Sequence, residues 1–430
     1  MYKVILRNFK ERVIVIRVMQ IKQMNENLVN KDGLQWNPRC NAKIYKDNII
    51  ITNMDTGNWT IVKKNVFNNL CYYMRQGRTV EEKLRTIEKE LIDRRILIGA
   101  SELALKRHPE IISIMLTNLC NLSCKHCCVD DISWNEGNVY YVIDEVVKIN
   151  PLEIMITGGE PMVSPIFFDV LKYLRSKYQG KICLSTNGTL IDEKNVSILG
   201  KLIDKFDISI DGTEEKNASI IRGKGVWEKV IHAIELLKSN GVINISMSMV
   251  LTDYNRMSIQ KFYALNEKYG TYPIIRNVIL NKNVIDNIDE LFDGGFAKYR
   301  RDELKRIQNM KINNHYMGRN SCGMIRYQLF ITANGDIYPC GGLAIDKFLL
   351  GNLKEIGGLE AFYEREKSYI DFVIDKMLKS SELMENCQIC GLRDLCWKCM
   401  SIVYNYLEIP ECFKEYCGAN IDNITRELQI

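Results

Sequence analysis

Three cysteines at short, fixed spacing have the clearest chemical potential in this chain. Cys120, Cys124 and Cys127 lie in the run LTNLCNLSCKHCCVD, directly after the apolar stretch Ile111 to Leu116. Cysteine thiolates are the usual protein ligands of iron–sulfur clusters, and most clusters bind four of them. Three thiolates on a short polar loop can each hold one iron of a four-iron cluster. The fourth iron is then open to a small molecule.

A structural zinc site is the alternative for the same loop. Three thiolates and the imidazole of His126 make up a common zinc ligand set. His126 stands between two of the cysteines, which makes simultaneous ligation awkward. Cys128 follows Cys127 directly, and adjacent cysteines rarely serve one small cluster. We therefore interpret Cys128 as a packing residue.

The composition predicts a cytoplasmic globular chain of two or three domains. The chain has 430 residues, of which 46% are hydrophobic and 26% charged, with a net charge of +5. That charge is small for this length, so it does not indicate a nucleic-acid partner. Charged residues interrupt every apolar run near the N-terminus, which excludes a secretory signal. No stretch approaches the ~20 apolar residues of a membrane span. The 15 cysteines therefore indicate metal binding rather than disulfides.

Strands and helical patterns alternate between residues 111 and 280. The predicted strands are Ile112–Leu116, Glu153–Thr157, Lys181–Ser185, Phe206–Ile210, Asn244–Val250 and Ile274–Ile279. Amphipathic patterns lie between them, for example at residues 139–146 and 226–237. This order is typical of βαβ units and a parallel sheet. Six units are too few for a closed eight-stranded barrel, so we expect an α/β fold with an open barrel.

Polar and glycine clusters follow several of these strands, where ligands collect in parallel α/β folds. The clusters are Thr157-Gly158-Gly159-Glu160-Pro161, Ser185-Thr186-Asn187-Gly188, Ser209-Ile210-Asp211-Gly212 and, in the next loop, Arg222-Gly223. A glycine pair lets the backbone approach a ligand closely, and its carbonyls and amides can bind an amino group. An ordinary turn is the alternative for the glycine pair. Asp211 either contacts substrate or shapes its turn.

The region before residue 106 is predicted to be a winged-helix-like domain. Short strands are expected at Lys43–Asp47, Ile49–Thr52 and Trp59–Val62, with one or two more between Met1 and Met19. Helices are expected at Asn65–Met74 and Thr79–Glu90, the second opened by a capping box of Thr79 and Glu82. Such a domain binds DNA through a helix, binds a peptide at a sheet edge, or serves as an interdomain or dimer-forming cap.

Cysteines return in the last quarter of the chain. A hairpin is predicted from Tyr327–Thr332 and Asp336–Tyr338. A charged helical stretch, Asp289 to Gln308, precedes it and is interpreted as a solvated connector. The cysteines of this region are Cys322, Cys340, Cys387, Cys390, Cys396, Cys399, Cys412 and Cys417. Two C-x2-C pairs alone indicate zinc, but the number of cysteines exceeds one tetrahedral site.

Residues 108 to 417 resemble the radical S-adenosylmethionine (SAM) enzymes. The family signature is the three-cysteine motif after a first strand, followed by a glycine-glycine-glutamate element after the second. The family usually has an aromatic residue where His126 stands. The resemblance implies an open (β/α)6 partial TIM barrel and a catalytic [4Fe–4S] cluster on Cys120, Cys124 and Cys127. It also implies SAM contacts from Gly158, Gly159, Glu160, Ser185, Asn187, Ser209 and Arg222.

Each SAM contact has an implied role. The glycine-glycine-glutamate element contacts the amino group of SAM, and the polar strand ends hold its ribose and carboxylate. The Arg222 guanidinium suits the carboxylate because it pairs bidentately. SAM then binds the open iron, one electron cleaves its sulfonium–C5′ bond, and the resulting 5′-deoxyadenosyl radical abstracts hydrogen from substrate. A flavodoxin or ferredoxin is the expected reductant.

The late cysteines resemble the SPASM extension, a small cysteine-rich domain that binds two auxiliary iron–sulfur clusters. By this resemblance Cys322, Cys340 and Cys399 hold the first auxiliary cluster. The second is held by Cys387, Cys390, Cys396 and a late cysteine, either Cys417, which we prefer, or Cys412. Two residues separate Cys396 from Cys399, where the family has three. The chain is thus expected to hold three [4Fe–4S] clusters.

Residues 41 to 98 resemble the RiPP recognition element, a PqqD-like domain that binds the leader of a ribosomally made, modified peptide. The implied domains are 1–105 for leader binding, 106–280 for the radical SAM barrel, 281–321 as a bridge and 322–430 for SPASM. Together they imply a peptide maturase that forms a thioether crosslink, as in sactipeptides and ranthipeptides.

Three alternatives to this function remain. Carbon–carbon crosslinking by the same architecture is the close runner-up. Sulfatase maturation is disfavoured, because Gly341 stands where those relatives carry an acidic residue. A zinc-containing regulator that binds DNA or peptide is the alternative from another class.

Overall fold

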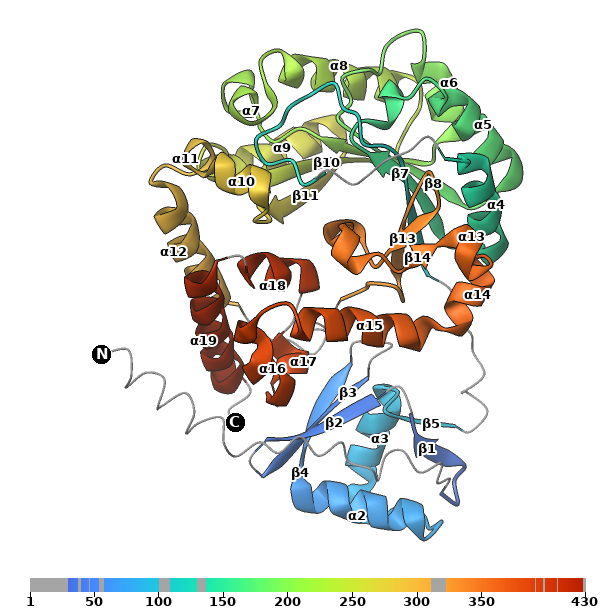
Figure 1. The fold of residues 1–430 in the computed structure, drawn as a ribbon, viewed down its shortest axis with the longest axis vertical. Helices are drawn as coiled ribbons and strands as arrows, with labels where there is room; N and C mark the ends of the chain where they lie inside the picture. The colour runs from blue at the N-terminus through green and yellow to red at the C-terminus, as the bar shows by residue number, and fades with distance from the viewer. Residues whose placement is uncertain are drawn as a thin grey trace. The chain divides into compact units, whose positions relative to one another are not determined.

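The computed structural model describes most of the chain (Figure 1). It covers residues 30–37, 40–45, 47–53, 58–99, 109–129, 137–310, 322–390, 392–396, 399–407 and 409–427. These residues form two compact units, described separately here. The sheet unit comprises His108–Arg301 and Met324–Ile374, and the mixed unit comprises Met1–Arg107, Asp302–Gly323 and Asp375–Ile430. The strands predicted between Met1 and Met19 lie outside the described residues.

The sheet unit is built on one mostly parallel sheet of nine described strands, in the order β11-β10-β9-β8-β7-β6-β12-β13-β14. The first six in sequence are β6 (Ile111–Thr117), β7 (Glu153–Gly158), β8 (Lys181–Thr186), β9 (Lys205–Ser209), β10 (Ile245–Leu251) and β11 (Tyr272–Asn277). All six were predicted, with the largest displacement at β11. The predicted hairpin is also present: its first strand, β12 (Gln328–Thr332), pairs parallel with β6, and its second, β13 (Asp336–Tyr338), pairs antiparallel with β12 and with β14 (Gly351–Asn352). The α/β prediction is therefore confirmed.

Helices connect and flank these strands. They are α4 (Val139–Ile149), α5 (Phe167–Lys177), α6 (Val196–Leu202), α7 (Glu215–Arg222), α8 (Val226–Ser239), α9 (Ile259–Tyr269), α10 (Lys282–Asp286), α11 (Ile288–Leu291), α12 (Gly295–Gln308), α13 (Leu353–Ile356), α14 (Leu359–Glu364) and α15 (Glu366–Leu378). The single charged helix predicted from Asp289 to Gln308 is wrong. Gly294 and Gly295 both adopt positive φ, a conformation that ends one helix before the next begins.

The strand register separates an apolar face from a polar one. Residues that pair across strands point to the same side of a sheet, and the side alternates along each strand. One face carries the buried aliphatic pairs of neighbouring strands, such as Ile154 with Ile182 and Leu184 with Phe206. The other carries Ser185, which pairs with Asp207, and Ser209, which pairs with Ser248. Helices α4 to α9 lie outside the sheet in Figure 1. The polar face is therefore the place for ligands.

The N-terminal part of the mixed unit is a three-stranded antiparallel sheet followed by two helices. Its elements are β2 (Cys40–Tyr45), β3 (Asn48–Asn53), β4 (Trp59–Lys63), α2 (Lys64–Arg75) and α3 (Arg85–Asp93), while β1 (Leu34–Trp36) pairs with β5 (Leu97–Gly99). The predicted capping box at Thr79 is wrong. A short 3-10 turn begins at Glu82, and its N-cap, Glu81, makes no side-chain cap bond. The chain stays extended there because Val80 and Leu84 both bury in the core.

Three short helices and one long helix make up most of the C-terminal part of the mixed unit. They are α16 (Glu385–Ile389), α17 (Arg393–Cys396), α18 (Met400–Leu407) and α19 (Pro410–Glu427).

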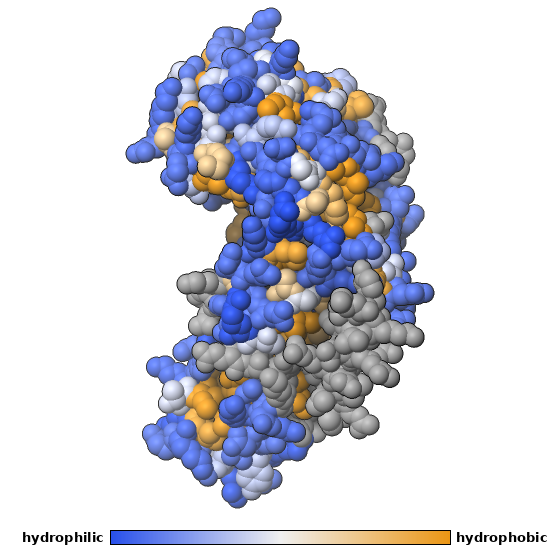
Figure 2. All heavy atoms as spheres, turned by 90° about the vertical axis from the view of Figure 1, so that its left-hand side faces the viewer, coloured by the Kyte–Doolittle hydropathy of each residue, from blue (hydrophilic) through white to orange (hydrophobic). Residues whose placement is uncertain are grey.

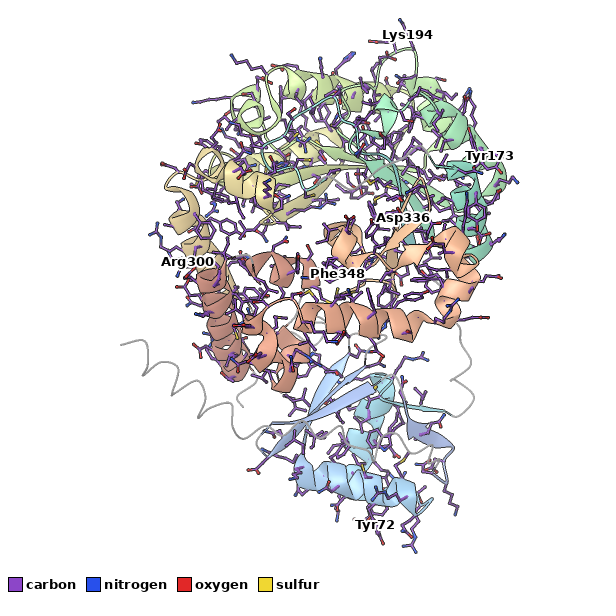
Figure 3. The ribbon with its side chains drawn as sticks, in the orientation of Figure 1. Tyr72, Tyr173, Lys194, Arg300, Asp336 and Phe348 are labelled. Atoms are coloured by element: carbon purple, nitrogen blue, oxygen red, sulfur yellow. The ribbon has the colours of Figure 1, made fainter. Side chains whose placement is uncertain are left out.

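Hydrophilic side chains cover most of the coloured surface drawn in Figure 2. Figure 3 places Tyr72 on the outer side of α2, where its side chain is exposed. Among the described residues, no helix is both long and apolar enough to cross a membrane.

Candidate functional site

The three-cysteine loop begins where β6 ends, on the carboxyl side of the parallel sheet. Cys120 is exposed, while Cys124 and Cys127 are half-buried. The loop is tightened by a bond from Cys127 N to Cys124 O at 3.1 Å. Burial raises the pKa of the Cys124 thiol to about 11, although the charge of Arg222 opposes that shift. The neighbouring thiols of Cys120 and Cys127 raise the same pKa further, which shows that the three groups lie within electrostatic range.

The three thiols of the loop are the donor set of an iron–sulfur cluster with one open iron. Within the described ranges, no three His, Cys, Asp or Glu side chains converge closely enough to hold one metal ion. Cluster thiolates bind separate irons, so they stand further apart than the ligands of one ion. The Nε2 atom of His126 lies 2.7 Å from Asp211 Oδ2, so only its Nδ1 atom is left for a metal. The residues present therefore fit a three-thiolate iron–sulfur cluster.

The glycine pair packs directly against the start of this loop. A Cβ on Gly158 would lie 2.1 Å from Thr117 O, and one on Gly159 would lie 2.3 Å from Leu119 O. The Gly159 amide donates to Thr117 O at 2.8 Å, and the Glu160 amide donates to Leu119 O at 2.8 Å. These two amides hold the cysteine loop, and contact of the glycine pair's carbonyls with the amino group of SAM stays a prediction.

Replacing Gly159 by alanine is expected to displace the cysteine loop. The new methyl group would overlap backbone atoms of Leu119 that have no space to move aside. We expect Gly159→Ala to lose most of the loop's iron and its SAM binding, measured by iron analysis and calorimetry. Gly200→Ala is the matched control, because its Cβ would meet only a Val242 methyl at 3.2 Å. Equal iron and SAM binding in both variants would contradict this account.

Glu160 braces two strand ends rather than facing open space. Its side chain is fully buried, and its carboxylate accepts bonds from Thr186 Oγ1 at 2.8 and 2.9 Å and from Asn187 N at 2.7 Å. A further bond comes from Met162 N at 3.2 Å. Burial raises the pKa of this carboxyl, while the donors from Asn187, Thr186 and Met162 oppose the rise. Glu160 thus fixes the turn that presents Asn187.

Asn187 reaches the first cysteine. Its Nδ2 lies 3.8 Å from Cys120 Sγ and donates to Asn121 Oδ1 at 2.8 Å. Its Oδ1 accepts bonds from the amide and hydroxyl of Thr189. Among the residues predicted to bind SAM, Asn187, Glu160 and the glycine pair are therefore gathered at the cysteine loop. Ser185 and Ser209 lie on the polar face of the sheet.

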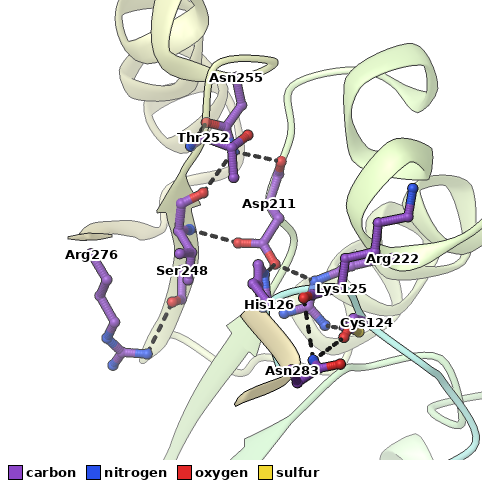
Figure 4. A network of polar contacts seen from close by, with 11 residues as sticks. Cys124, Lys125, His126, Asp211, Arg222, Ser248, Thr252, Asn255, Arg276 and Asn283 are labelled. Carbon is purple, nitrogen blue, oxygen red and sulfur yellow. Dashed lines mark hydrogen bonds and ion pairs between the residues drawn. The ribbon is translucent and has the colours of Figure 1, made fainter. Parts of the chain in front are cut away.

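A buried charge network joins the end of β9 to the second cysteine (Figure 4). Asp211 Oδ2 lies 2.5 Å from Arg222 Nε, and Asp211 Oδ1 accepts from Val250 N at 2.6 Å. Arg222 Nη1 lies 3.7 Å from Cys124 Sγ. Burial alone would raise the pKa of the Asp211 carboxyl, but the charges of Arg222 and His126 hold it below its usual range. Both Asp211 oxygens serve the protein, and only the Nη atoms of Arg222 remain for a carboxylate.

Three candidate functional residues were not predicted from the sequence. Asn281 and Asn283 follow β11, in the segment 281–321 predicted to be a bridge, and their side chains bond to the backbone of the cysteine loop. Arg276 lies on the polar face and donates to Ser248 Oγ at 3.0 Å. Asparagines in a polar connector carry no recognisable spacing. Only knowledge of which loop lies beside them would have identified them.

The late cysteines divide between the two units. Cys340 follows β13 in the sheet unit, where Tyr338 and Ala344 pack with Met115 of β6 and with Val129, just after the cysteine loop. Cys322 and the remaining late cysteines belong to the mixed unit. There burial raises the pKa of Cys417 to about 12, with further contributions from Cys387 and Cys390. Cys412 is buried.

Cys396 and Cys399 also lie near a buried ionisable group. Burial raises the pKa of Tyr416, and the thiols of Cys396 and Cys399 raise it further.

The thiols of Cys40 and Cys71 pack in the core of the N-terminal part. Cys183 is buried in β8. These three cysteines therefore lie in packed interiors.

Comparisons with known proteins agree with this geometry. Residues 114–265 match the Radical SAM superfamily, and residues 322–391 match the SPASM iron–sulfur cluster-binding domain. The mycofactocin maturase MftC of Mycobacterium ulcerans is 27% identical over 335 residues, which cover 72% of this chain and 89% of that protein. The cysteine-type anaerobic sulfatase-maturating enzyme of Clostridium perfringens is 26% identical over 321 residues, covering 64% and 84%.

A solved structure shares the fold. Streptococcus suis SuiB bound to S-adenosylmethionine superposes with a TM-score of 0.52 at 16% identity, covering 87% of this chain and 97% of that chain. The matches to the Radical SAM and SPASM models, with three thiols at the carboxyl end of a parallel sheet, define a SAM-dependent iron–sulfur enzyme. This chain contains a Radical SAM domain and a SPASM domain. Its cofactors are SAM and iron–sulfur clusters.

Proposed function

We propose that this enzyme matures a ribosomally made precursor peptide by forming a thioether crosslink. The observation that carries the proposal is the joining of three parts in one chain. A radical SAM domain and a SPASM domain follow a small domain of three antiparallel strands and two helices. The curated relative MftC is itself named a maturase. The three-part architecture and this relative together support a peptide substrate.

The residues of the sheet unit have distinct roles in this proposal. Cys120, Cys124 and Cys127 hold the SAM-binding cluster, and the Arg222 Nη atoms, Ser185 and Ser209 bind SAM on the polar face. Glu160 and Asp211 orient Asn187 and Arg222 through buried bonds. When bound, SAM and its cluster supply a radical that takes one hydrogen atom from a substrate carbon. The six parallel strands, β6 to β11, form the proposed open partial barrel.

The auxiliary clusters are assigned from the late cysteines. We place the second cluster on Cys387, Cys390, Cys396 and Cys417, because Cys417 lies within electrostatic range of the first two. The first is placed on Cys322, Cys340 and Cys399, which gives three clusters in all. Held by these three cysteines, the first cluster would supply an acceptor for one electron, since crosslinking removes one carbon-bound hydrogen atom, one thiol proton and one electron from the substrate. A carbon–sulfur bond replaces the two broken bonds.

The leader peptide is proposed to add a strand to the edge at β4. In an antiparallel pair, alternate residues turn their backbone groups away from the partner strand. The bond from Asn53 N to Asn58 O, and that from Lys64 N to Asp47 O, set this alternation. The outward residues of β4 are therefore Trp59, Ile61 and Lys63.

The Trp59 carbonyl is one of these outward backbone groups, and it has a hydrogen-bond partner on the outer side of β4. The Arg94 side chain of the turn after α3 donates to Trp59 O at 2.5 Å. It closes one end of the edge and leaves the groups of Ile61 directed outward. A peptide strand that pairs with β4 would therefore be anchored at Ile61 and Lys63.

A proline at the outward position tests this leader site. Proline is tolerated at an edge strand where the missing N–H faces outward, so Ile61→Pro removes a leader contact and keeps the β3–β4 ladder. We expect it to abolish binding of a fluorescent leader peptide, measured by polarisation. Ile44→Pro is the matched control, since Ile44 faces outward on the opposite edge strand, β2. Loss of binding in Ile44→Pro alone would move the site to β2 and contradict the assignment.

A further inference from the structure

Two asparagines beyond the last parallel strand grip the backbone of the three-cysteine loop. Asn283 Nδ2 lies 3.2 Å from Cys124 O, 3.2 Å from Lys125 O and 3.3 Å from Cys127 O. Asn281 Nδ2 donates to Cys127 O at 2.8 Å. Three loop carbonyls therefore lie within reach of one Asn283 amide. Because a side-chain amide has two N–H donors, it can bond to two of them at once. Figure 4 shows Asn283 below Cys124 and Lys125, with its nitrogen toward both.

The two amides are held in this orientation by their own segment. Asn287 Nδ2 donates to Asn283 Oδ1 at 3.1 Å and to Asn283 O at 2.7 Å. Asn281 Oδ1 accepts from Val284 N at 2.8 Å, which caps the start of α10. Since each amide oxygen is engaged by a donor from α10 or its end, each amide nitrogen faces the loop. Asn281 and Asn283 thus direct their amide N–H groups at the loop through contacts within their own segment.

Different residues hold the sulfurs and the backbone carbonyls of the loop. The sulfurs of Cys120 and Cys124 receive bonds from Asn187, just after β8, and from Arg222, at the end of α7. The carbonyls on the other side are held by the segment 281–290. Its last residue, Glu290, also forms an ion pair with Lys125. The loop is thus fixed from two sides that are far apart in sequence.

We propose that Asn283, assisted by Asn281, is a positioning residue for the SAM-binding cluster. A donor on each carbonyl fixes the backbone dihedrals between Cys124 and Cys127, and so the separation of their thiols. Hydrogen bonds around a cluster also tune its potential and its retention. Loss of the Asn283 donors removes the bonds to Cys124 O and Lys125 O, while Cys127 O keeps its bond from Asn281. This inference concerns the cluster alone and does not depend on the identity of the peptide.

The substitution Asn283→Asp isolates the donor, because it changes one NH2 group into an oxygen of nearly the same size. The carboxylate cannot donate and places negative charge beside three carbonyls. Asn244→Asp is the matched control, since exposed Asn244 makes the same kind of bond, from Nδ2 to Asp204 O at 3.3 Å. Asn283→Ala is a second variant that removes the donor without adding charge. All variants are made in the full chain and reconstituted anaerobically with iron and sulfide.

Two readouts are needed. The first is the electron paramagnetic resonance signal of the reduced enzyme that changes when SAM is added, which reports the SAM-binding cluster. The second is hydrogen exchange of residues 117–129 in the chain without iron. We expect both Asn283 variants to lose most of the SAM-responsive signal. Exchange should be roughly tenfold faster, as expected for the loss of one or two hydrogen bonds. Asn244→Asp should match the original enzyme in both.

Three results would overturn the proposal. The Asn283 variants could keep both the full SAM-responsive signal and the original exchange rate, which would show that Asn283 does not hold the loop. They could instead show faster exchange with an unchanged signal, which would show that Asn283 stabilises the loop without positioning the cluster. An equal loss in Asn244→Asp would show that the effect is not specific to the loop. Failure of leader binding would leave these readouts unchanged, so the two proposals are tested separately.

Discussion

Replacing Cys124 by alanine should abolish 5′-deoxyadenosine formation while leaving the auxiliary clusters in place. Cys124 is the middle thiol of the loop, and it receives a bond from the buried Arg222. With only two thiols left, the SAM-binding cluster is not retained. We expect iron to fall from about twelve to about eight atoms per chain, the change for one four-iron cluster of three. Iron analysis and chromatography of the SAM products measure both effects.

The matched control for this substitution is Cys128→Ala, which removes a thiol from the same loop. Cys128 is exposed and adjacent to Cys127. We assign Cys128 no role in binding a cluster, so the iron content and SAM cleavage of Cys128→Ala should be unchanged. Cleavage by the Cys124 variant at the original rate would refute the enzyme mechanism. Loss of cleavage in the Cys128 variant would show that the ligand assignment within the loop is wrong.

Replacing Asp211 by asparagine should destabilise the sheet unit strongly. The carboxylate is the counter-charge of Arg222, and both side chains are almost completely buried. Removing one partner of a buried ion pair leaves an uncompensated charge and costs about 3–5 kcal/mol. The amide nitrogen would also face the Arg222 Nε donor. Urea unfolding of the iron-free chain measures the loss.

An exposed pair provides the comparison. Asp375 lies 2.7 Å from Lys379 on α15, with both side chains more than half exposed. Solvent screens such pairs, so Asp375→Asn should cost about 0.2–1 kcal/mol at most. Equal losses for the two substitutions would contradict the role given to the buried network. A stable Asp211→Asn variant that still binds SAM normally would show that Arg222 is positioned by other groups.

The sequence predicted what local patterns encode. Each strand from β6 to β11 is a short apolar run bounded by polar or glycine residues, and the cysteine loop follows the first of them. The glycine pair was predicted to be close to a ligand. In the structure the same lack of side chains brings its backbone against Thr117 and Leu119. The two glycines thus indicated a close backbone approach, but the sequence did not show which groups would lie against them.

Long-range contacts could not be predicted in this way. His126 and Asp211 are 85 residues apart, and Asn281 is 154 residues from Cys127. No spacing rule connects such pairs, because the fold alone brings them together. The break between α11 and α12 had a visible signal in Gly294 and Gly295. The charged pattern on both sides of that pair favoured one continuous helix.

The mass of a precursor peptide after reaction tests the central claim most directly. The peptides encoded beside this enzyme would each be incubated with the reconstituted enzyme, SAM and dithionite, then alkylated at free thiols and measured by mass spectrometry. A thioether predicts the loss of two hydrogen atoms and of one alkylatable thiol in the same peptide. SAM cleavage with every peptide unchanged would contradict the maturase. Loss of two hydrogens with all thiols still alkylated would contradict the thioether.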